Sequence, residues 1–170
     1  MADNTKKQYQ KEYALEERIL ALLKQHGLTV TTTESCTGGL LAGRLLNAAG
    51  ASEVYKEGYI TYSNEAKEKL LGVSKQTLAS YGAVSEQTAL EMAQGAARQA
   101  GADAALATTG IAGPGGGTPE KPVGLVYIGC YVNDVSVAEE HVFAGERAQV
   151  RSLAVEAALS LLERTLKGVL

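Results

Sequence analysis

Several residue types are scarce in this chain. Its 170 residues include no tryptophan, one phenylalanine, three prolines, two cysteines and two histidines. Two cysteines can form only one disulfide, and so few thiol and imidazole groups argue against a disulfide scaffold or a zinc cluster. An excess of positive charge is also missing, since 16 Lys and Arg residues are set against 19 Asp and Glu residues. Because broad binding to a phosphate backbone needs such an excess, the composition argues against a general nucleic-acid-binding protein.

Long apolar runs are missing as well. No stretch approaches the ~20 apolar residues that a membrane span requires, and the polar start of the chain has no apolar signal-peptide core. We therefore expect a cytoplasmic protein without a membrane partner. A chain of this length can bury about two-thirds of its unfolded surface, enough for one real core. We expect a polar tail at residues 1–8 and a single domain over residues 9–170.

Small residues are abundant instead, with 19 glycines in the chain. Residues 110–122 hold five of these glycines and all three prolines. Neither standard phosphate-binding fingerprint is present there, because the segment lacks a Gly-Lys-Ser/Thr ending and the Gly-x-Gly-x-x-Gly spacing. Consecutive glycines still let backbone N–H groups approach a ligand closely. This segment is therefore predicted to line a pocket largely with backbone atoms.

Apolar periodicity and turn residues predict an α/β fold. Helices are expected over residues 9–25, 40–47, 64–71, 86–99 and 146–166, and strands over 28–34, 54–62, 102–108, 123–132 and 135–143. Ser63 is suited to begin the third helix and Gly72 to end it. Asn133 and Asp134 predict a hairpin turn. Early alternation of helices and strands, followed by this late antiparallel hairpin, predicts a three-layer α/β/α sandwich with a mixed, mainly parallel sheet.

Ser35 is a candidate nucleophile. It follows a β-branched strand and precedes Gly38, Gly39 and a predicted helix. At such a turn, backbone N–H groups can hold an oxyanion beside a reacting hydroxyl. The alternative is that Ser35 or Thr37 only caps the helix, for which these residue types are well suited.

Lys67 is a candidate general base. On a helix over residues 64–71 it shares a stripe with Leu70 and Leu71, whereas Lys69 faces Glu65. Burial would lower the pKa of Lys67 from ~10.4 towards values that suit a base. The alternative is a lysine that extends its amine into solvent. Because both histidines lie in unremarkable contexts, a serine nucleophile has few other bases available.

Arg147 and Arg151 lie four residues apart near the predicted start of the last helix. The helix macrodipole disfavours cations there, so the pair is expected to meet an anion. One alternative is an ion pair with Glu146 or another surface acid. The other is a phosphate or carboxylate of a ligand.

Seven segments, in this order along the chain, resemble the C-terminal amidohydrolase domain of the CinA family, which includes the PncC nicotinamide-nucleotide amidases. They are residues 34–39 (ESCTGG), 62–67 (YSNEAK), 71–73 (LGV), 82–85 (GAVS), 109–117 (TGIAGPGGG), 121–124 (KPVG) and 145–151 (GERAQVR). The resemblance implies hydrolysis of nicotinamide mononucleotide to nicotinate mononucleotide and ammonia, in pyridine nucleotide recycling. It also implies a serine–lysine mechanism that uses no metal and no cofactor, in a stand-alone form of the domain.

The resemblance also assigns roles to residues. It implies that Ser35 is the nucleophile, that Lys67 is its general base and that the Tyr62 hydroxyl positions or relays the proton. Thr109 is expected near the reacting centre and Arg147 on the substrate phosphate. The remaining residues expected to contact substrate are Thr37, Gly38, Gly39, Gly110, Gly113 and Arg151.

Two other functions compete with this hypothesis. One is a cysteine hydrolase that uses Cys36 with His26 or His141, although both histidines are distant in sequence from the glycine turn. The other is a non-catalytic module that binds a pyridine nucleotide in the same pocket without turnover. We also expect a homo-oligomer, packed through the alanine-rich helices.

Overall fold

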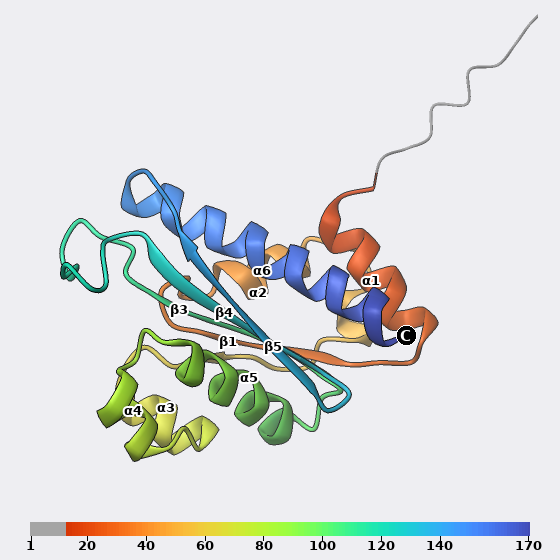
Figure 1. The fold of residues 1–170 in the computed structure, drawn as a ribbon. Coiled ribbons are helices and arrows are strands. Elements are labelled where there is room, and N and C mark those ends of the chain that lie inside the picture. The colour runs from red at the N-terminus through yellow and green to blue at the C-terminus, as the bar shows by residue number, and fades with distance from the viewer. Residues whose placement is uncertain (1–12) are drawn as a thin grey trace, which may run out of the picture.

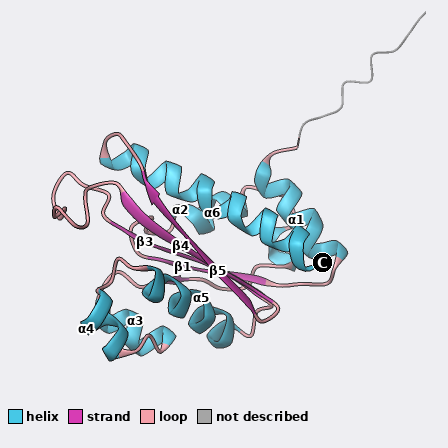
Figure 2. Cartoon of the chain, viewed as in Figure 1, coloured by secondary structure: helices cyan, strands magenta, loops and turns pink. Residues whose placement is uncertain are grey.

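One mixed sheet forms the centre of the molecule. The computed structural model describes residues 13–170, in which five strands are arranged in the order β2-β1-β3-β4-β5. Figure 2 shows strands of this sheet in magenta between the helices. The strands are β1 (Val30–Glu34), β2 (Tyr59–Ile60), β3 (Ala104–Gly110), β4 (Leu125–Val132) and β5 (Val135–Val142). β1 pairs in parallel with β2 and β3, whereas β4 is antiparallel to both β3 and β5. Since β4 alone among these strands runs against the others, the expected mixed, mainly parallel sheet is confirmed.

Helices cover both faces of this sheet. α1 (Leu15–Gln25), α2 (Leu40–Leu46) and α6 (Arg147–Val169) lie on one face, and α3 (Asn64–Leu71), α4 (Lys75–Tyr81) and α5 (Glu86–Ala100) lie on the other (Figure 1). Each helical layer packs its own cluster of buried side chains against the sheet. The three-layer α/β/α sandwich is therefore confirmed. None of these helices is long and apolar enough to cross a membrane.

Local capping signals explain the most accurate predictions. α3 begins after Ser63, whose Oγ accepts a hydrogen bond from the Ala66 amide at 3.1 Å, and it ends at Gly72, which has a φ of 70°. Asn133 and Asp134 have φ values of 45° and 68°, as a tight hairpin turn between β4 and β5 requires. These elements depend on residues next to each other in sequence, so the sequence alone predicts them.

The segment before α3 differs from its prediction. A strand was expected over residues 54–62, but β2 contains only Tyr59 and Ile60, and Tyr55 forms an isolated bridge with Val30. The Tyr55 hydroxyl instead hydrogen-bonds Thr32 Oγ1 at 2.8 Å, so side-chain contacts replace the backbone ladder there. Helix α4 was not predicted, because its seven residues show little periodicity and, unlike the equally short α2, it does not follow a pair of glycines. The proposed polar tail, and the first part of the helix expected over residues 9–25, lie outside the described residues.

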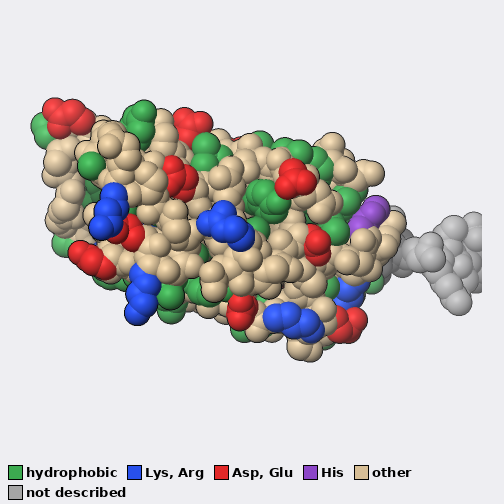
Figure 3. All heavy atoms as spheres, turned by 90° about the horizontal axis from the view of Figure 1, so that it is seen from below, with side chains coloured by type: hydrophobic (Ala, Val, Ile, Leu, Met, Phe, Trp, Pro, Cys, Tyr) green, Lys and Arg blue, Asp and Glu red, His purple; other side chains and the backbone are tan. Residues whose placement is uncertain are grey.

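Close contacts hold α3 and α5 together. α5 runs past α3 at Gly95, where an added Cβ would lie 2.1 Å from the Leu71 carbonyl oxygen. α5 also approaches the sheet at Gly129, where a Cβ would lie 2.3 Å from the Ala89 carbonyl oxygen. Seen from the α3–α5 side, acidic and basic side chains are interspersed over the surface (Figure 3). Glycine at these two points lets α5 pack closely against both α3 and the sheet, and Lys67 of α3 reaches Ser35 and Thr61, which directly follow β1 and β2.

Replacing Gly95 by alanine tests this close packing. Gly95→Ala should lower the free energy of unfolding by about 1–3 kcal/mol, because the new methyl group meets the Leu71 backbone. Gly43→Ala in α2 is the matched control, since a Cβ added at Gly43 would have no atom within 4 Å and alanine favours helix by up to about 1 kcal/mol. Urea unfolding of both variants measures the difference. Equal effects of the two substitutions would contradict the packing described.

Candidate active site

A cavity of about 220 Å³ opens at the carboxyl ends of the parallel strands. Loops that follow β1, β2 and β3 meet there, as they do at this edge of many α/β sheets. Its lining comes from these loops, the end of β3, the connection between α4 and α5, α3 and the start of α6: Ser35, Cys36, Tyr62, Lys67, Ala83, Val84, Thr109, Gly110, Ala112 and Arg147. The structure therefore brings together the predicted nucleophile, the predicted base and further predicted site residues from distant parts of the chain.

Ser35 and Lys67 contact each other in this cavity. Lys67 Nζ lies 3.2 Å from Ser35 Oγ and donates a hydrogen bond of 2.7 Å to the Thr61 carbonyl oxygen. The Lys67 side chain is only 1% exposed, and within residues 13–170 no carboxylate forms an ion pair with it. Burial lowers the pKa of Lys67 below its ordinary value of 10.5. An uncharged Lys67 amine can accept the proton of the Ser35 hydroxyl.

Glu34, which the sequence analysis did not identify, caps α2 in place of Ser35. Its carboxylate is 1% exposed and accepts hydrogen bonds from the amides of Gly39, Leu41 and Ala42 at 2.9–3.0 Å. Thr37 Oγ1 donates to the same carboxylate at 2.5 Å. A carboxylate is well suited to the unpaired N–H groups of a first helical turn. Because Glu34 fills this role and Thr37 Oγ1 contacts Glu34 and Thr108 instead of an amide, the alternative that Ser35 or Thr37 caps the helix is wrong.

The turn after Ser35 requires both of its glycines. Gly38 and Gly39 have φ values of 55° and 103°, and the Leu40 amide donates to the Thr37 carbonyl oxygen at 3.2 Å. Two central residues with positive φ define a type I′ turn, which glycine adopts without strain. Thr37, Gly38 and Gly39 therefore build the turn that carries Ser35, and the cavity lining on this side comes from Ser35 and Cys36, directly before them.

The two arginines of α6 have different surroundings. Arg147 lines the cavity, where it donates to the Gly113 carbonyl oxygen at 2.9 Å and to the Tyr62 hydroxyl at 3.3 Å. Arg151 lies outside the lining and donates to the carbonyl oxygens of Cys36 and Thr37 at 3.0 and 2.9 Å. Neither arginine forms an ion pair with any carboxylate in the described part of the chain, so the surface-pair alternative is not observed. Arg147 is the arginine that presents its charge to the cavity.

Tyr62 lies at the rim of the cavity. Its side chain is 65% exposed, and its hydroxyl accepts the hydrogen bond from Arg147. In the described structure no hydrogen bond joins this hydroxyl to Ser35 or Lys67. In this arrangement Tyr62 contacts the arginine at the cavity mouth and not the serine–lysine pair.

Two side chains donate hydrogen bonds to backbone carbonyls at and near the connection between α4 and α5, which lines part of the cavity. Thr109 Oγ1 donates to the Ala83 carbonyl oxygen at 2.7 Å. Lys121 Nζ donates to the carbonyl oxygens of Tyr81 and Val84 at 2.5 and 2.7 Å. Thr109 was expected at the reacting centre, whereas Lys121 was missed, because a lysine in a glycine-rich loop gives no sequence signal for binding distant carbonyls.

Cys36 also lines the cavity, but its surroundings do not suit a nucleophile. Burial raises the pKa of its thiol to about 11, so it is protonated at neutral pH. Neither histidine lines the cavity: His26 follows α1, and His141 pairs with Glu139 on β5. Within residues 13–170 no group of three or more His, Cys, Asp or Glu side chains is placed to hold a metal ion. The geometry therefore disfavours the cysteine hydrolase.

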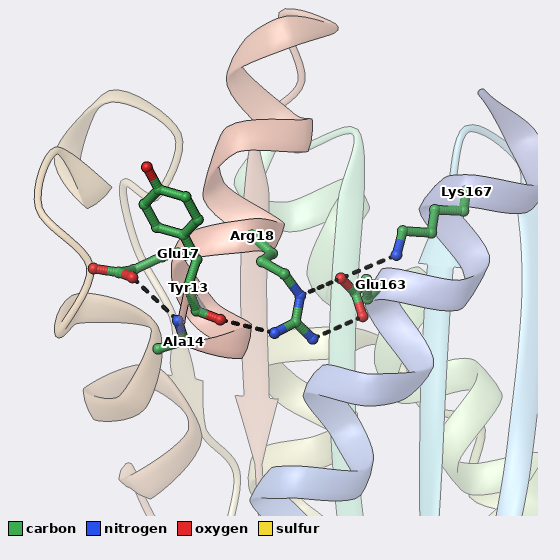
Figure 4. A network of polar contacts seen from close by, with 6 residues as sticks. All are labelled: Tyr13, Ala14, Glu17, Arg18, Glu163 and Lys167. Carbon is green, nitrogen blue, oxygen red and sulfur yellow. Dashed lines mark hydrogen bonds and ion pairs between the residues drawn. The ribbon is translucent and has the colours of Figure 1, made fainter. Parts of the chain in front are cut away.

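A larger concavity of about 670 Å³ lies elsewhere, between α1 and α6. Figure 4 shows its charged side chains in contact with one another: Arg18 donates to Glu163 at 2.8 Å, and Lys167 pairs with the same carboxylate at 3.1 Å. Hydrogen bonds from Arg18 lower the pKa of Glu163 to about 2. No serine, threonine or cysteine of the described chain lines this concavity. Because the contact between Ser35 and Lys67 lies in the smaller cavity, that cavity is the candidate active site.

Comparisons with known proteins agree with the fold. The model of the CinA C-terminal domain matches residues 12–166. A CinA-like protein of Kosmotoga olearia is 55% identical over 155 residues, which cover 91% of this chain and 38% of that protein. A putative competence-damage inducible protein of Clostridium novyi is 56% identical over 161 residues, which cover 93% of this chain and 39% of that protein. The chain thus spans less than two-fifths of the length of these curated relatives.

Solved structures are similar over nearly their whole length. The competence/damage inducible protein CihA from Agrobacterium tumefaciens superposes with a TM-score of 0.86 at 46% identity, covering 90% of this chain and 93% of that one. A CinA superfamily protein from Escherichia coli has a TM-score of 0.86 at 40% identity, with coverages of 89% and 88%. On the family match and these similarities, the chain belongs to the CinA C-terminal domain family.

Proposed function

We propose that this protein is an amidohydrolase that converts nicotinamide mononucleotide to nicotinate mononucleotide and ammonia. The observation that carries the proposal is the 3.2 Å contact between Ser35 Oγ and the buried amine of Lys67. A hydroxyl next to an amine with a lowered pKa is the arrangement that a serine–lysine hydrolase needs. Membership of the CinA C-terminal domain family supports the same class of reaction, because the family resemblance implies it.

The reaction begins when neutral Lys67 takes the proton of Ser35 and Ser35 Oγ attacks the carboxamide carbon. The carbonyl oxygen becomes an oxyanion, which backbone N–H groups after Ser35 stabilise. Protonated Lys67 then gives its proton to the departing amide nitrogen, and ammonia leaves an acyl ester on Ser35. Lys67 next activates a water that attacks this ester, releasing the carboxylate and restoring Ser35. The Thr61 carbonyl holds the amine in place throughout.

Arg147 supports a substrate with an anionic group. Its guanidinium lies at the cavity mouth beside the exposed Tyr62, while the serine–lysine pair lies deeper. A cavity of about 220 Å³ suits the reacting carboxamide and its ring, with the remainder of the substrate extending past the mouth. In the proposed complex the mononucleotide phosphate pairs with Arg147, as charge-assisted hydrogen bonds favour.

Replacement of either member of the pair should nearly abolish activity. Ser35→Ala removes the nucleophile and Lys67→Met removes the base, so each should lower the rate of ammonia release by a factor of about 10³ or more. Lys69→Met is the matched control, because Lys69 lies on the exposed side of the same helix. Unchanged ammonia release in Ser35→Ala would refute the mechanism. Calorimetric binding of the mononucleotide by the wild type without ammonia release would instead support the non-catalytic module.

The lowered pKa of Lys67 predicts how the rate depends on pH. The uncharged amine is the active form, so kcat/KM should rise with pH and level off above the folded-state pKa, which lies below 10.5. The same shift affects stability, because the unfolded chain binds more protons between the two pKa values. The free energy of unfolding, measured relative to Lys67→Met, should therefore rise with pH through that window. A rate that falls with increasing pH across it would contradict this role for Lys67.

Arg147 can be tested through substrates with and without a phosphate. Arg147→Gln should raise KM for nicotinamide mononucleotide about 10-fold or more, since a charge-assisted bidentate contact is lost. KM for free nicotinamide should change little, because that substrate has no anion to bind. Ammonia release measured over a range of each substrate provides the comparison. Equal changes for the two substrates would argue against a phosphate partner for Arg147.

A further inference from the structure

Arg151 donates hydrogen bonds to the backbone of the turn after Ser35. Its Nε and Nη2 atoms donate to the carbonyl oxygens of two consecutive residues, Cys36 and Thr37, at 3.0 and 2.9 Å. The side chain is half-buried, has no ion-pair partner in the described part of the chain and lies outside the cavity lining. An arginine that binds two successive carbonyls fixes the orientation of two successive peptide planes.

Most amides around this turn already have acceptors. The Ser35 amide donates to the Thr108 carbonyl at 2.9 Å, and the Leu40 amide donates to Thr37. Glu34 accepts hydrogen bonds from the amides at the start of α2. These amides are therefore not available to bind a ligand. For the amides of Thr37 and Gly38 there is no acceptor among residues 13–170.

The contacts of Arg151 determine the direction of these two amides. In a trans peptide the carbonyl of one residue and the N–H of the next point to opposite sides. Because the carbonyls of Cys36 and Thr37 face Arg151, the N–H groups of Thr37 and Gly38 face away from it. A cation at the carbonyl oxygen also polarises the peptide and strengthens its N–H as a donor.

We propose that Arg151 is a positioning residue for catalysis. By holding the carbonyls of Cys36 and Thr37, it presents the N–H groups of Thr37 and Gly38 to the oxyanion that forms when Ser35 attacks. This inference rests on the proposed function. It assigns Arg147 to the substrate phosphate and Arg151 to the transition state, although the two arginines lie four residues apart on one helix.

Steady-state kinetics on nicotinamide mononucleotide separate these two roles. Arg151→Gln should lower kcat about 100-fold, the loss typical of a disturbed oxyanion donor, with KM nearly unchanged. Arg151→Lys, which can keep one of the two carbonyl contacts, should recover part of that loss and guards against a misfolded Gln variant. Arg164→Gln is the control, because Arg164 is exposed on the same helix and pairs with Glu139 far from the cavity. A rise in KM with kcat unchanged would overturn the proposal and indicate that Arg151 binds the phosphate.

A second readout does not depend on the substrate. A fluorophosphonate probe phosphonylates a reactive serine: the Ser35 O–P bond forms, fluoride leaves and the base takes the hydroxyl proton. The phosphonyl oxygen uses the same donors as the oxyanion, so labelling of Arg151→Gln should be about 100-fold slower than that of the wild type. Added guanidinium should restore part of the rate. Thermal unfolding of each variant shows whether it is folded under the conditions in which the labelling rates are compared.

The outcomes distinguish this inference from the proposed function. Labelling of wild-type Ser35 without ammonia release would refute the proposed substrate, whereas the comparison with Arg151→Gln would still decide the role of Arg151. Equal labelling rates in the wild type and Arg151→Gln would overturn the positioning role, whatever the substrate. Absence of wild-type labelling would refute the serine nucleophile and the positioning role together.

Discussion

The burial of one amine is the constraint on which the rest of the site depends. Lys67 Nζ lies within hydrogen-bond distance of the Ser35 hydroxyl and the Thr61 carbonyl, on a side chain that is almost fully enclosed. Charged and without a counter-ion, it would be costly to bury, so burial lowers the pKa of the amine and shifts its equilibrium towards the neutral form that a general base requires. The cost to stability and the benefit to catalysis arise from the same desolvation. The remaining packing has to supply enough stability to keep the amine buried.

That packing is built from contacts around α3. Ser63 caps the helix and Gly72 ends it, so its length is set locally. Gly95 then lets α5 approach the Leu71 backbone, which places α3 against the layer that covers the sheet. Ser35 contacts Lys67 from the short turn after β1. Glu34 accepts a hydrogen bond from the Gly39 amide of that turn, and Arg151 donates to its Cys36 carbonyl oxygen. Every fully buried side-chain nitrogen and oxygen in the described structure has a hydrogen-bond partner, so these polar groups are accommodated without unpaired atoms.

Sequence reasoning succeeded where the signal was local or amphipathic. The boundaries of α3, the Asn133–Asp134 turn and the apolar orientation of Lys67 all follow from residues within one or two turns of each other. It failed at β2, where the contact between Tyr55 and Thr32 replaces strand pairing, and at α4, which is short and, unlike α2, does not follow a pair of glycines. It also missed Glu34 and Lys121, because their partners are backbone groups that only folding brings near.

By itself the sequence determined the layered α/β architecture and the chemical types at the site, namely a serine at a glycine turn, a lysine on an apolar helical face and two arginines. It determined these because periodicity, capping and turn conformation are short-range properties of the chain. Folding in three dimensions sets which arginine reaches the cavity and which binds the Ser35 turn, since a spacing of four places both on one face of α6. The same is true of the 3.2 Å contact between Ser35 and Lys67, which depends on how closely two layers pack across the sheet edge.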